Sequence, residues 1–493
     1  MMNKQTALQK RYDVLIIGSG VVGSALAREL SRYQLNVAVL EKELDVCTET
    51  SGRNSGVIHA GFNNKPGSLM AKFCVEGCLG YGVVADEIDI PFSRTGKLVV
   101  GFDDEDRKKL QALKEAGEQN GVPGLEIVES DVIRDKAPAI LGEMALYSPM
   151  TGITNPFLYT VALAENAVQN GVSLWLNHEV TAIEQVDDGY QVQTTQGVFE
   201  SRWVINCAGL FADRVARMVG IDDYTIYPCR GEYLVLDKEL GSQLPLPAYP
   251  VPNIREGGLG IHLTPTTDGN ILVGPSTDYI DEHTDYGTTR SILDLLMREG
   301  RKIFPPLNPS AVIRTFAGVR PKLVSRTTGG YADFVIEHRP ETRHFINMVG
   351  LESPGLTAAV PIARNVISII GEYEDLRENP SFNPCREGIL SFKDQTPERQ
   401  ESLIHENPDY GVVVCRCEGI TQAEILAAIR NPLGVTTLSG IKNRSRAMMG
   451  RCQGGYCQIR IAELIMAEQN RSEESVMLAR KGSRTFVGKV RPS

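Results

Sequence analysis

The chain has 493 residues, with 51 Lys and Arg against 61 Asp and Glu, for a formal net charge of −10 at pH 7. This length is too great for one hydrophobic core, so two or three domains are expected, and the acidic balance argues against a general nucleic-acid binder. The charge is unevenly distributed: residues 411–493 carry 13 basic and 6 acidic side chains, whereas residues 1–410 carry 38 and 55. The sequence therefore predicts a basic C-terminal module attached to an acidic body.

The N-terminal stretch "MMNKQTALQKRYDVLIIGSG" contains no apolar run long enough for a signal peptide, because "VLII" has only the length of a strand. No later stretch approaches the ~20 apolar residues that a membrane-spanning helix needs. These observations predict a cytoplasmic protein without a direct membrane span. Structural disulfides are rare in that compartment.

Residues 12–43 have the pattern of a dinucleotide-binding βαβ unit. An apolar strand leads into Gly18, Gly20 and Gly23 in G-x-G-x-x-G spacing, a helix follows, and a second strand ends at Glu41. The glycines allow a tight turn, close approach of a pyrophosphate and close helix packing, and Glu41 can accept hydrogen bonds from a ribose. A glycine-rich turn with an exposed Glu is the alternative, but strand, helix and acid all lie where a nucleotide site needs them.

The nucleotide-binding pattern continues in two later pieces. The stretch "RWVINCAGLFAD" runs into Ala208 and Gly209, and "FINMVGLESPGLTAAVPIARNVISII" brings Gly350, Ser353 and Gly355 between a strand and a helix. A domain assembled from three pieces suits FAD, which needs contacts along its whole length. Between the pieces, stretches such as "GKLVVGF" and "GNILVGPS" predict strands of an antiparallel sheet.

Three further stretches carry a family resemblance over residues 12–375: "SGRNSGVIHAGFNNKPGSLMAKFCVEG", "GITNPFLYTVALAENAVQNGV" and "TFAGVRP". They resemble the FAD-dependent oxidoreductases of the D-amino-acid oxidase and glycerol-3-phosphate dehydrogenase superfamily, and the first is equally similar to L-2-hydroxyglutarate dehydrogenases. The resemblance implies an α/β fold: a Rossmann-like FAD-binding domain with an inserted antiparallel-sheet substrate domain that covers the flavin ring. The FAD-binding pieces would be about 12–85, 150–225 and 330–375, and the substrate-domain pieces about 85–150 and 225–330. It also implies that Ser51, Asn54 and Ser55 contact FAD.

Oxidation of a secondary alcohol by flavin requires loss of the hydroxyl proton and transfer of hydride, so a base or hydrogen-bond acceptor must lie near the carbon. His59 is the candidate, since the resemblance implies a position at the flavin ring and a pKa near neutral suits the role. A histidine that orders the loop, or one bonded covalently to flavin, is the alternative. For an anionic substrate, Arg320 is the predicted anchor, because a guanidinium binds carboxylate or phosphate in a bidentate manner. Arg53 is a second candidate that can instead contact FAD phosphate, and Arg230 and Lys322 are weaker ones, interpreted by default as solvated charges.

Two cysteine pairs mark the C-terminal module: Cys415-x-Cys417, then 34 residues, then Cys452-x4-Cys457. This spacing resembles the bacterioferritin-associated ferredoxin type of [2Fe–2S] domain, with Thr421 and Glu424 in capping-box spacing at a helix start. A four-cysteine zinc site is the alternative, although its pairs are usually C-x2-C. The remaining thiols are interpreted as ordinary buried cysteines: Cys47, Cys74, Cys78, Cys207, Cys229 and Cys385. Four basic residues lie near the cysteine pairs, and they can offset the charge of the cluster, dock an acidic partner or simply be solvated: Lys442, Arg444, Arg446 and Arg451.

The sequence thus predicts an oxidoreductase body (1–375), a linker (376–410), a small helical [2Fe–2S] module (411–470) and a polar tail (471–493). The expected function is FAD-dependent oxidation of a small anionic secondary alcohol, with electrons leaving through the cluster to an acceptor protein or partner subunit. Attachment of such a module resembles the large subunit of anaerobic glycerol-3-phosphate dehydrogenases, so sn-glycerol 3-phosphate is the first substrate and peripheral attachment to the inner membrane through partner subunits is an option. L-2-hydroxyglutarate or another 2-hydroxy acid is the second substrate. The third hypothesis is an electron-transfer subunit without its own alcohol site.

Overall fold

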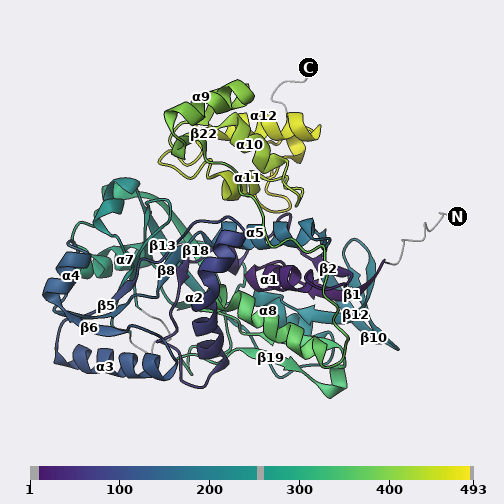
Figure 1. Ribbon diagram of the computed structural model, residues 1–493, viewed down its shortest axis with the longest axis horizontal. Helices are drawn as coiled ribbons and strands as arrows, with labels where there is room; N and C mark the ends of the chain where they lie inside the picture. The colour runs from purple at the N-terminus through teal and green to yellow at the C-terminus, as the bar shows by residue number, and fades with distance from the viewer. Residues whose placement is uncertain (1–9, 253–259, 489–493) are drawn as a thin grey trace.

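The structure is a computed structural model that describes residues 10–252 and 260–488. The parts of the predicted ranges within residues 1–9, 253–259 and 489–493 lie outside the described residues. The body carries two large sheets beside each other, and the C-terminal module lies on one side of it, with α11 nearest to the body (Figure 1).

The first sheet forms the nucleotide-binding lobe. Its strands β1, β2, β9, β12 and β20 pair in parallel, and β10, β11 and β19 add antiparallel edges. Because parallel strands are buried on both faces, their sequences read as continuous apolar runs, as in "VLII" and "VAVL". Helix α1 packs against α5 and α8, and α8 also packs against α2. The bounds of the strands are β1 (Lys10–Ile17), β2 (Val37–Leu40), β9 (Ser173–Trp175), β10 (Val180–Val186), β11 (Gly189–Thr194), β12 (Val198–Asn206), β19 (Val335–His338) and β20 (Phe345–Val349), and those of the helices α1 (Val21–Leu30), α2 (Leu69–Glu87), α5 (Pro156–Gln169), α6 (Ala212–Arg217) and α8 (Gly355–Gly371).

The second sheet forms the other lobe of the body, beside the nucleotide-binding lobe. Its strands pair antiparallel, except that β14 runs parallel to β5, and the long pair β13–β18 is its most extensive. A small sheet, β3 (Val57–Ile58), β8 (Gly152–Thr154) and β4 (Phe92–Ser93), adjoins the nucleotide lobe through the contact of β3 with α8. The elements are β5 (Lys97–Gly101), β6 (Glu126–Glu129), β7 (Met144–Ser148), β13 (Tyr227–Leu236), β14 (Ala248–Pro250), β15 (His262–Pro265), β16 (Ile271–Gly274), β17 (Asp278–Tyr279), β18 (Val312–Lys322), α3 (Asp104–Gln119), α4 (Ser130–Lys136) and α7 (Arg290–Ile303).

The predicted fold class is confirmed: a Rossmann-like nucleotide lobe is assembled from separated pieces, a largely antiparallel sheet is inserted, and a small helical domain follows. The module has its own apolar core, centred on Ile425, Ile441 and Ile461. The capping box of Thr421 and Glu424 starts α10 as expected. The module consists of β21 (Val413–Cys415), β22 (Ile420–Thr421), α10 (Gln422–Ile429), α11 (Leu438–Ser445) and α12 (Gln458–Gln469).

The linker and the tail both pack against folded parts of the chain. The first half of the linker lies against the body, where the Arg386 guanidinium pairs with Glu165 at 2.7 Å. The second half forms α9 (Pro397–Glu406), and Ile389 packs on the module core. In the tail, Val476 is fully buried in that core. The polar composition of the tail gave no sign of this contact.

The module binds to the body largely through ion pairs. Arg444 donates to both oxygens of Asp45, at 2.7 and 2.9 Å, and this pair is buried. Arg446 pairs with Asp268, and Arg451 pairs with Asp237 at 2.8 Å. Three of the four basic residues near the cysteines therefore meet acidic residues of the chain's own body. The charge difference read from the sequence matches this docking.

Candidate functional site

The turn from β1 into α1 can only be built from glycine. Gly18 has φ +102°, and a Cβ there would lie 2.6 Å from the Cys207 carbonyl oxygen; a Cβ on Gly23 would lie 2.0 Å from the Gly18 oxygen. A Cβ on Gly20 would press on the Ser51 hydroxyl at 3.0 Å, and that hydroxyl accepts a hydrogen bond from the Val21 N–H at 2.9 Å. The strand end, the turn and the Ser51 loop are thus packed as one unit around the start of α1.

Glu41 lies at the end of β2 and is buried. Its carboxylate accepts hydrogen bonds from the Ser19 N–H at 2.9 Å, the Ser19 hydroxyl at 2.8 Å and the Glu43 N–H at 2.9 Å. Burial raises the pKa of Glu41, and these hydrogen bonds oppose that shift. A carboxylate fixed at this position can also accept bonds from a ribose diol, as the motif predicts.

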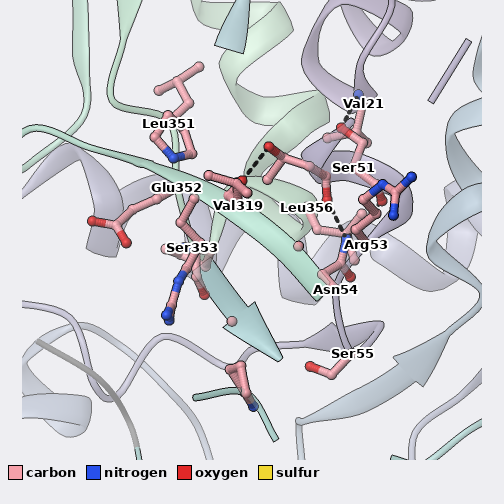
Figure 2. Close-up of a pocket in the computed structure, with 18 of the residues that line it drawn as sticks. Val21, Ser51, Arg53, Asn54, Ser55, Val319, Leu351, Glu352, Ser353 and Leu356 are labelled. Atoms are coloured by element: carbon pink, nitrogen blue, oxygen red, sulfur yellow. Dashed lines mark hydrogen bonds between the residues drawn. The ribbon is translucent and has the colours of Figure 1, made fainter. Parts of the chain in front are cut away.

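Two cavities of about 180 Å³ each extend from this turn and share the wall made by Gly20, Ser51, Cys207 and Gly209. One continues past Glu41 and Ala208, and the other continues to Gly350, Ser353 and Gly355. Figure 2 shows Ser51, Asn54 and Ser55 on one side of the second cavity and Glu352 and Ser353 on the other. An elongated space of this kind suits an extended dinucleotide. Of the predicted FAD contacts, Gly23 alone lines neither cavity, in keeping with its packing role.

Arg320 is the cation in the far part of the second cavity. Its Nη2 donates to the Ser276 carbonyl at 2.8 Å and approaches the Thr277 hydroxyl at 3.4 Å. Its Nε is buried and has no hydrogen-bond partner among the described residues. Tyr233, Tyr249 and Tyr331 line the same space. The unpartnered N–H of a permanently charged group is the feature expected of an anion site.

His59 follows β3 and lines the same cavity as Arg320. Its backbone N–H donates to the Thr357 hydroxyl at 3.0 Å, and no described residue hydrogen-bonds its ring nitrogens. Burial, together with the charge of Lys97, lowers the pKa of His59 to about 3. The near-neutral pKa expected from the sequence is wrong, because the sequence showed neither the burial nor the nearby lysine. The imidazole is neutral at pH 7 and can accept a hydrogen bond.

Lys97 is a functional candidate that the sequence reading missed. It starts β5, its side chain is 0% exposed, and Nζ lies 4.4 Å from the Phe62 ring centroid and 4.3 Å from that of Tyr249. Nζ has no hydrogen-bond partner among the described residues. Burial lowers the pKa of Lys97 to about 7. The only sign in the sequence was that a lysine precedes the apolar run "LVV". A lysine in that position is just as typical of an ordinary exposed strand end.

The weaker cation candidates occupy different positions. Lys322 is fully buried and forms an ion pair with Glu352, at 3.0 Å to each carboxylate oxygen, beside the Arg320 cavity. Arg230 is 8% exposed and pairs with Asp278 and Asp285 outside that cavity. Their default interpretation as solvated charges is therefore wrong.

Arg53 lies on the wall of the second cavity and faces the module side. Its guanidinium donates to the Thr48 carbonyl at 3.2 Å and to the Ala317 carbonyl at 3.4 Å, and it stacks over the Tyr286 ring at 4.1 Å. The backbone of Arg53 packs directly against Gly318, and only glycine allows this approach, since a Cβ on residue 318 would lie 2.0 Å from the Arg53 carbonyl oxygen.

The four predicted cluster ligands lie together in the module. The Sγ atoms of Cys415 and Cys417 are 3.9 Å apart, and those of Cys417 and Cys452 are 3.7 Å apart. Cys457, at the start of α12, shares a hydrogen bond with Cys415 that lowers its own pKa. Within the part of the chain that the structure describes, no three His, Cys, Asp or Glu side chains already have the geometry of a metal site. The thiols are gathered without being arranged around a centre.

The surroundings of the thiols fit a negatively charged cluster. Burial would raise the pKa of Cys452, but backbone N–H groups of residues 454–456 together with the Cys417 thiol lower it overall. Gly450 is required for close approach, since a Cβ there would lie 2.5 Å from the Cys417 sulfur. Backbone donors to the sulfurs and a tight glycine turn are what a [2Fe–2S] site uses.

The other cysteines lie outside the module. Cys47, Cys74, Cys78 and Cys229 are buried as expected, and Cys207 is partly buried. Cys385 is exposed, contrary to expectation.

Comparisons with known proteins give the same two parts. Residues 13–368 match the family of FAD dependent oxidoreductases, and residues 413–467 match the BFD-like [2Fe-2S] binding domain. The chain is 39% identical over 480 residues to a glycerol 3-phosphate dehydrogenase of Caloramator mitchellensis, covering 97% of this chain and 98% of the relative. It is 32% identical over 409 residues to the mitochondrial L-2-hydroxyglutarate dehydrogenase of Homo sapiens, covering 73% and 88%.

A solved structure extends the likeness to three dimensions. Dithionite-reduced L-alpha-glycerophosphate oxidase from Mycoplasma pneumoniae, with FAD bound, matches with a TM-score of 0.70 at 31% identity, covering 76% of this chain and 98% of that one. In residues 10–252 and 260–488, no helix has both the length and the apolar character to cross a bilayer.

Proposed function

The chain belongs to the family of FAD-dependent oxidoreductases, and on that premise we propose that it oxidises sn-glycerol 3-phosphate to dihydroxyacetone phosphate. The observation that carries the proposal is the cavity in which Arg320 presents an unpartnered N–H beside the neutral His59. The 39% identity to a glycerol 3-phosphate dehydrogenase over nearly the whole of both chains supports the choice of substrate.

The chain's own residues have distinct roles in this proposal. Arg320 binds the phosphate of the substrate with its free Nε–H and so orients the secondary alcohol. His59 accepts the hydroxyl proton at a ring nitrogen, and the bound anion favours that protonated state electrostatically. Arg53 is a second, weaker contact for substrate or for FAD phosphate. FAD, when bound along the contacts from Gly18 to Gly355, supplies the two-electron acceptor.

We further propose that electrons leave the body through a [2Fe–2S] cluster held by Cys415, Cys417, Cys452 and Cys457. The residue after Cys452 supports this route: the side chain of Gln453 accepts a hydrogen bond from Arg314, at 3.1 Å, on the strand β18 that also carries Arg320. Beside it, Tyr456 is 83% exposed and Cys417 is exposed, which offers a contact for an electron-acceptor protein or partner subunit. We propose a cytoplasmic location, in which such a partner can also hold the protein at the inner membrane.

L-2-hydroxyglutarate is the second candidate, and Lys97 is the observation that favours it. This substrate carries two carboxylates, and the described part of the chain has two cations around His59 whose buried N–H groups lack partners, on Arg320 and Lys97. Lys97 belongs to an adjoining cavity that shares His59, Tyr331 and Ser353 with the Arg320 cavity. The 32% identity to the human enzyme agrees with this alternative.

A substrate panel separates the candidates. Glycerol 3-phosphate, L-2-hydroxyglutarate and lactate are each added under argon to the FAD-loaded protein, and loss of flavin absorbance is followed. We expect fast bleaching with glycerol 3-phosphate. Bleaching by L-2-hydroxyglutarate alone would select the second candidate. If no alcohol bleaches the flavin, although dithionite reduces it, the remaining hypothesis is an electron-transfer subunit without its own alcohol site.

A further inference from the structure

A fourth cavity, of about 240 Å³, lies between the body and the cysteine module. Its body wall includes Arg314 and Phe316 of β18, and its module wall includes Ser439 and Lys442 of α11. The segment Arg53–Ser55 separates it from the cavity that holds Arg320 and His59, because that segment lines both. It is therefore distinct from the proposed alcohol site.

Three cations at this cavity have no carboxylate partner in the described part of the chain. The side-chain ammonium of Lys442 takes part in no hydrogen bond or ion pair there, Arg314 bonds to the Gln453 amide oxygen, and Arg53 donates to carbonyl oxygens. The carboxylates of the cavity wall are already used, since Asp45 is paired with Arg444 and Asp268 with Arg446. Burial and the charges of Arg314, Arg446 and Arg53 lower the pKa of Lys442 to about 7. Like charges therefore converge here without compensation.

An ordinary solvated basic face does not account for this arrangement. Arg314 is exposed at the rim, but Lys442 and Arg53 are both partly buried. Hydroxyl and amide groups of Thr266, Thr267 and Asn443 add donors, and Phe157, Phe316 and Met449 add an apolar wall. The cavity is larger than a bare phosphate ion requires, and the apolar wall suits an organic group attached to the anion.

We propose that this interface cavity binds the phosphate group of a small organic phosphate between Lys442 and Arg314, with Arg53 as a third contact. The cations come from both the body and the module, so a bound phosphate links the two and stabilises their docking. The site needs neither Arg320 nor His59, and the only cation that it shares with the proposed function is Arg53, which lines both cavities. Its occupant is a phosphate monoester, drawn either from the substrate pool or from another metabolite.

The experiment titrates glycerol 2-phosphate, which has no secondary alcohol, and inorganic phosphate into the FAD- and cluster-loaded full chain by calorimetry under argon. We expect a saturable site that Lys442→Gln and Arg314→Gln each weaken about tenfold or more, and that Lys442→Arg retains. The control Arg451→Gln removes a module cation that pairs with Asp237 elsewhere, and it should bind as the wild type does.

Thermal unfolding gives a second readout that does not depend on activity. Glycerol 2-phosphate should raise the Tm of Arg320→Ala, in which the alcohol cavity has lost its anion-binding cation, but not that of Arg320→Ala/Lys442→Gln. Lys442→Gln itself should unfold at the same temperature as the wild type without ligand or higher, because it removes an uncompensated charge. Equal weakening by Arg451→Gln, or full binding by Lys442→Gln, would overturn the proposal. If glycerol 3-phosphate binds more tightly than glycerol 2-phosphate, and Lys442→Gln removes that difference, the natural ligand of the site comes from the substrate pool.

Discussion

The cations at the module interface and those in the alcohol cavity have opposite surroundings. Arg444, Arg446 and Arg451 each meet a carboxylate of the body. Arg320 and Lys97 instead form no ion pair with a carboxylate in the described part of the chain, and each keeps a buried N–H without a hydrogen-bond partner there. A paired cation holds two parts of the chain together, whereas an unpaired one is available to a ligand. Substitution of the first kind should therefore reduce stability, and substitution of the second kind should reduce function.

The thiols give the largest expected effect on function. In Cys452→Ser/Cys457→Ser, the cluster should be absent and electron transfer to an acceptor protein should be lost, while substrate-driven flavin bleaching continues, because the module has its own core outside the body. Iron and sulfide analysis, with acceptor reduction and anaerobic bleaching, measures this. Cys385→Ser, outside the module, is the control. Stoichiometric zinc without iron in anaerobically prepared wild type would contradict the electron route.

His59→Ala should slow flavin reduction at saturating substrate by about 10²- to 10⁴-fold, the usual contribution of a positioned base. Substrate affinity should change little, since the anion is bound elsewhere. Stopped-flow absorbance under argon gives both quantities. His405→Ala, on helix α9 beside the module, serves as the matched control. Flavin reduction at the wild-type rate would show that His59 only orders its loop.

Arg320→Ala should raise KM for glycerol 3-phosphate by about 10- to 100-fold, because a charge-assisted contact to a buried anion is lost. The matched control is Arg326→Ala, whose side chain is 70% exposed and pairs with Asp278 at the surface. Steady-state kinetics with an artificial acceptor measures the difference. An unchanged KM would remove Arg320 from the substrate site.

The paired cations should behave differently. Asp45→Asn leaves the buried Arg444 with only the more distant Glu165 carboxylate, at 3.6 Å, and should destabilise docking of the module by up to about 3–5 kcal/mol. Arg451→Gln breaks an ion pair whose arginine is 68% exposed, and it should cost less than about 1 kcal/mol. Denaturant unfolding and limited proteolysis of the linker would report the two effects. Equal stability of both variants would contradict the expectation that the buried ion pair stabilises docking more than the exposed one.

The smallest effect concerns pH. Because burial lowers the pKa of Lys97 to about 7, this lysine is protonated below pH 7 and loses its attraction for an anionic substrate as the pH rises through 7. The kcat/KM of the wild type should fall above pH 7, and Lys97→Met should be lower at pH 6 and lack that inflection. Lys302→Met, whose lysine is 64% exposed and lies outside the cavities that contain Arg320 and Lys97, is the control. An identical pH profile for Lys97→Met would exclude the role.

The sequence predicted the parts of the molecule whose signals are local. The glycine spacing, the acid at the end of the second strand and the cysteine pairs are short patterns, and the nucleotide turn, Glu41 and the gathered thiols lie as those patterns require. What it missed depends on contacts between distant segments. The burial of Lys97 between Phe62 and Tyr249, and the low pKa of His59, arise only when β5, β14 and the loop after β3 meet. The ordered tail also had no periodic apolar pattern to reveal it.

The central claim is that one chain takes electrons from glycerol 3-phosphate and passes them to its own cluster. The most direct test mixes the FAD- and cluster-loaded protein with glycerol 3-phosphate under argon and follows flavin absorbance and the paramagnetic signal of the reduced cluster in the same samples. We expect flavin bleaching first, followed by the cluster signal, without any added carrier. The claim is contradicted if substrate leaves the flavin oxidised although dithionite reduces both centres. It is also contradicted if excess substrate bleaches the flavin but never reduces the cluster, although mild chemical reductants do reduce the cluster.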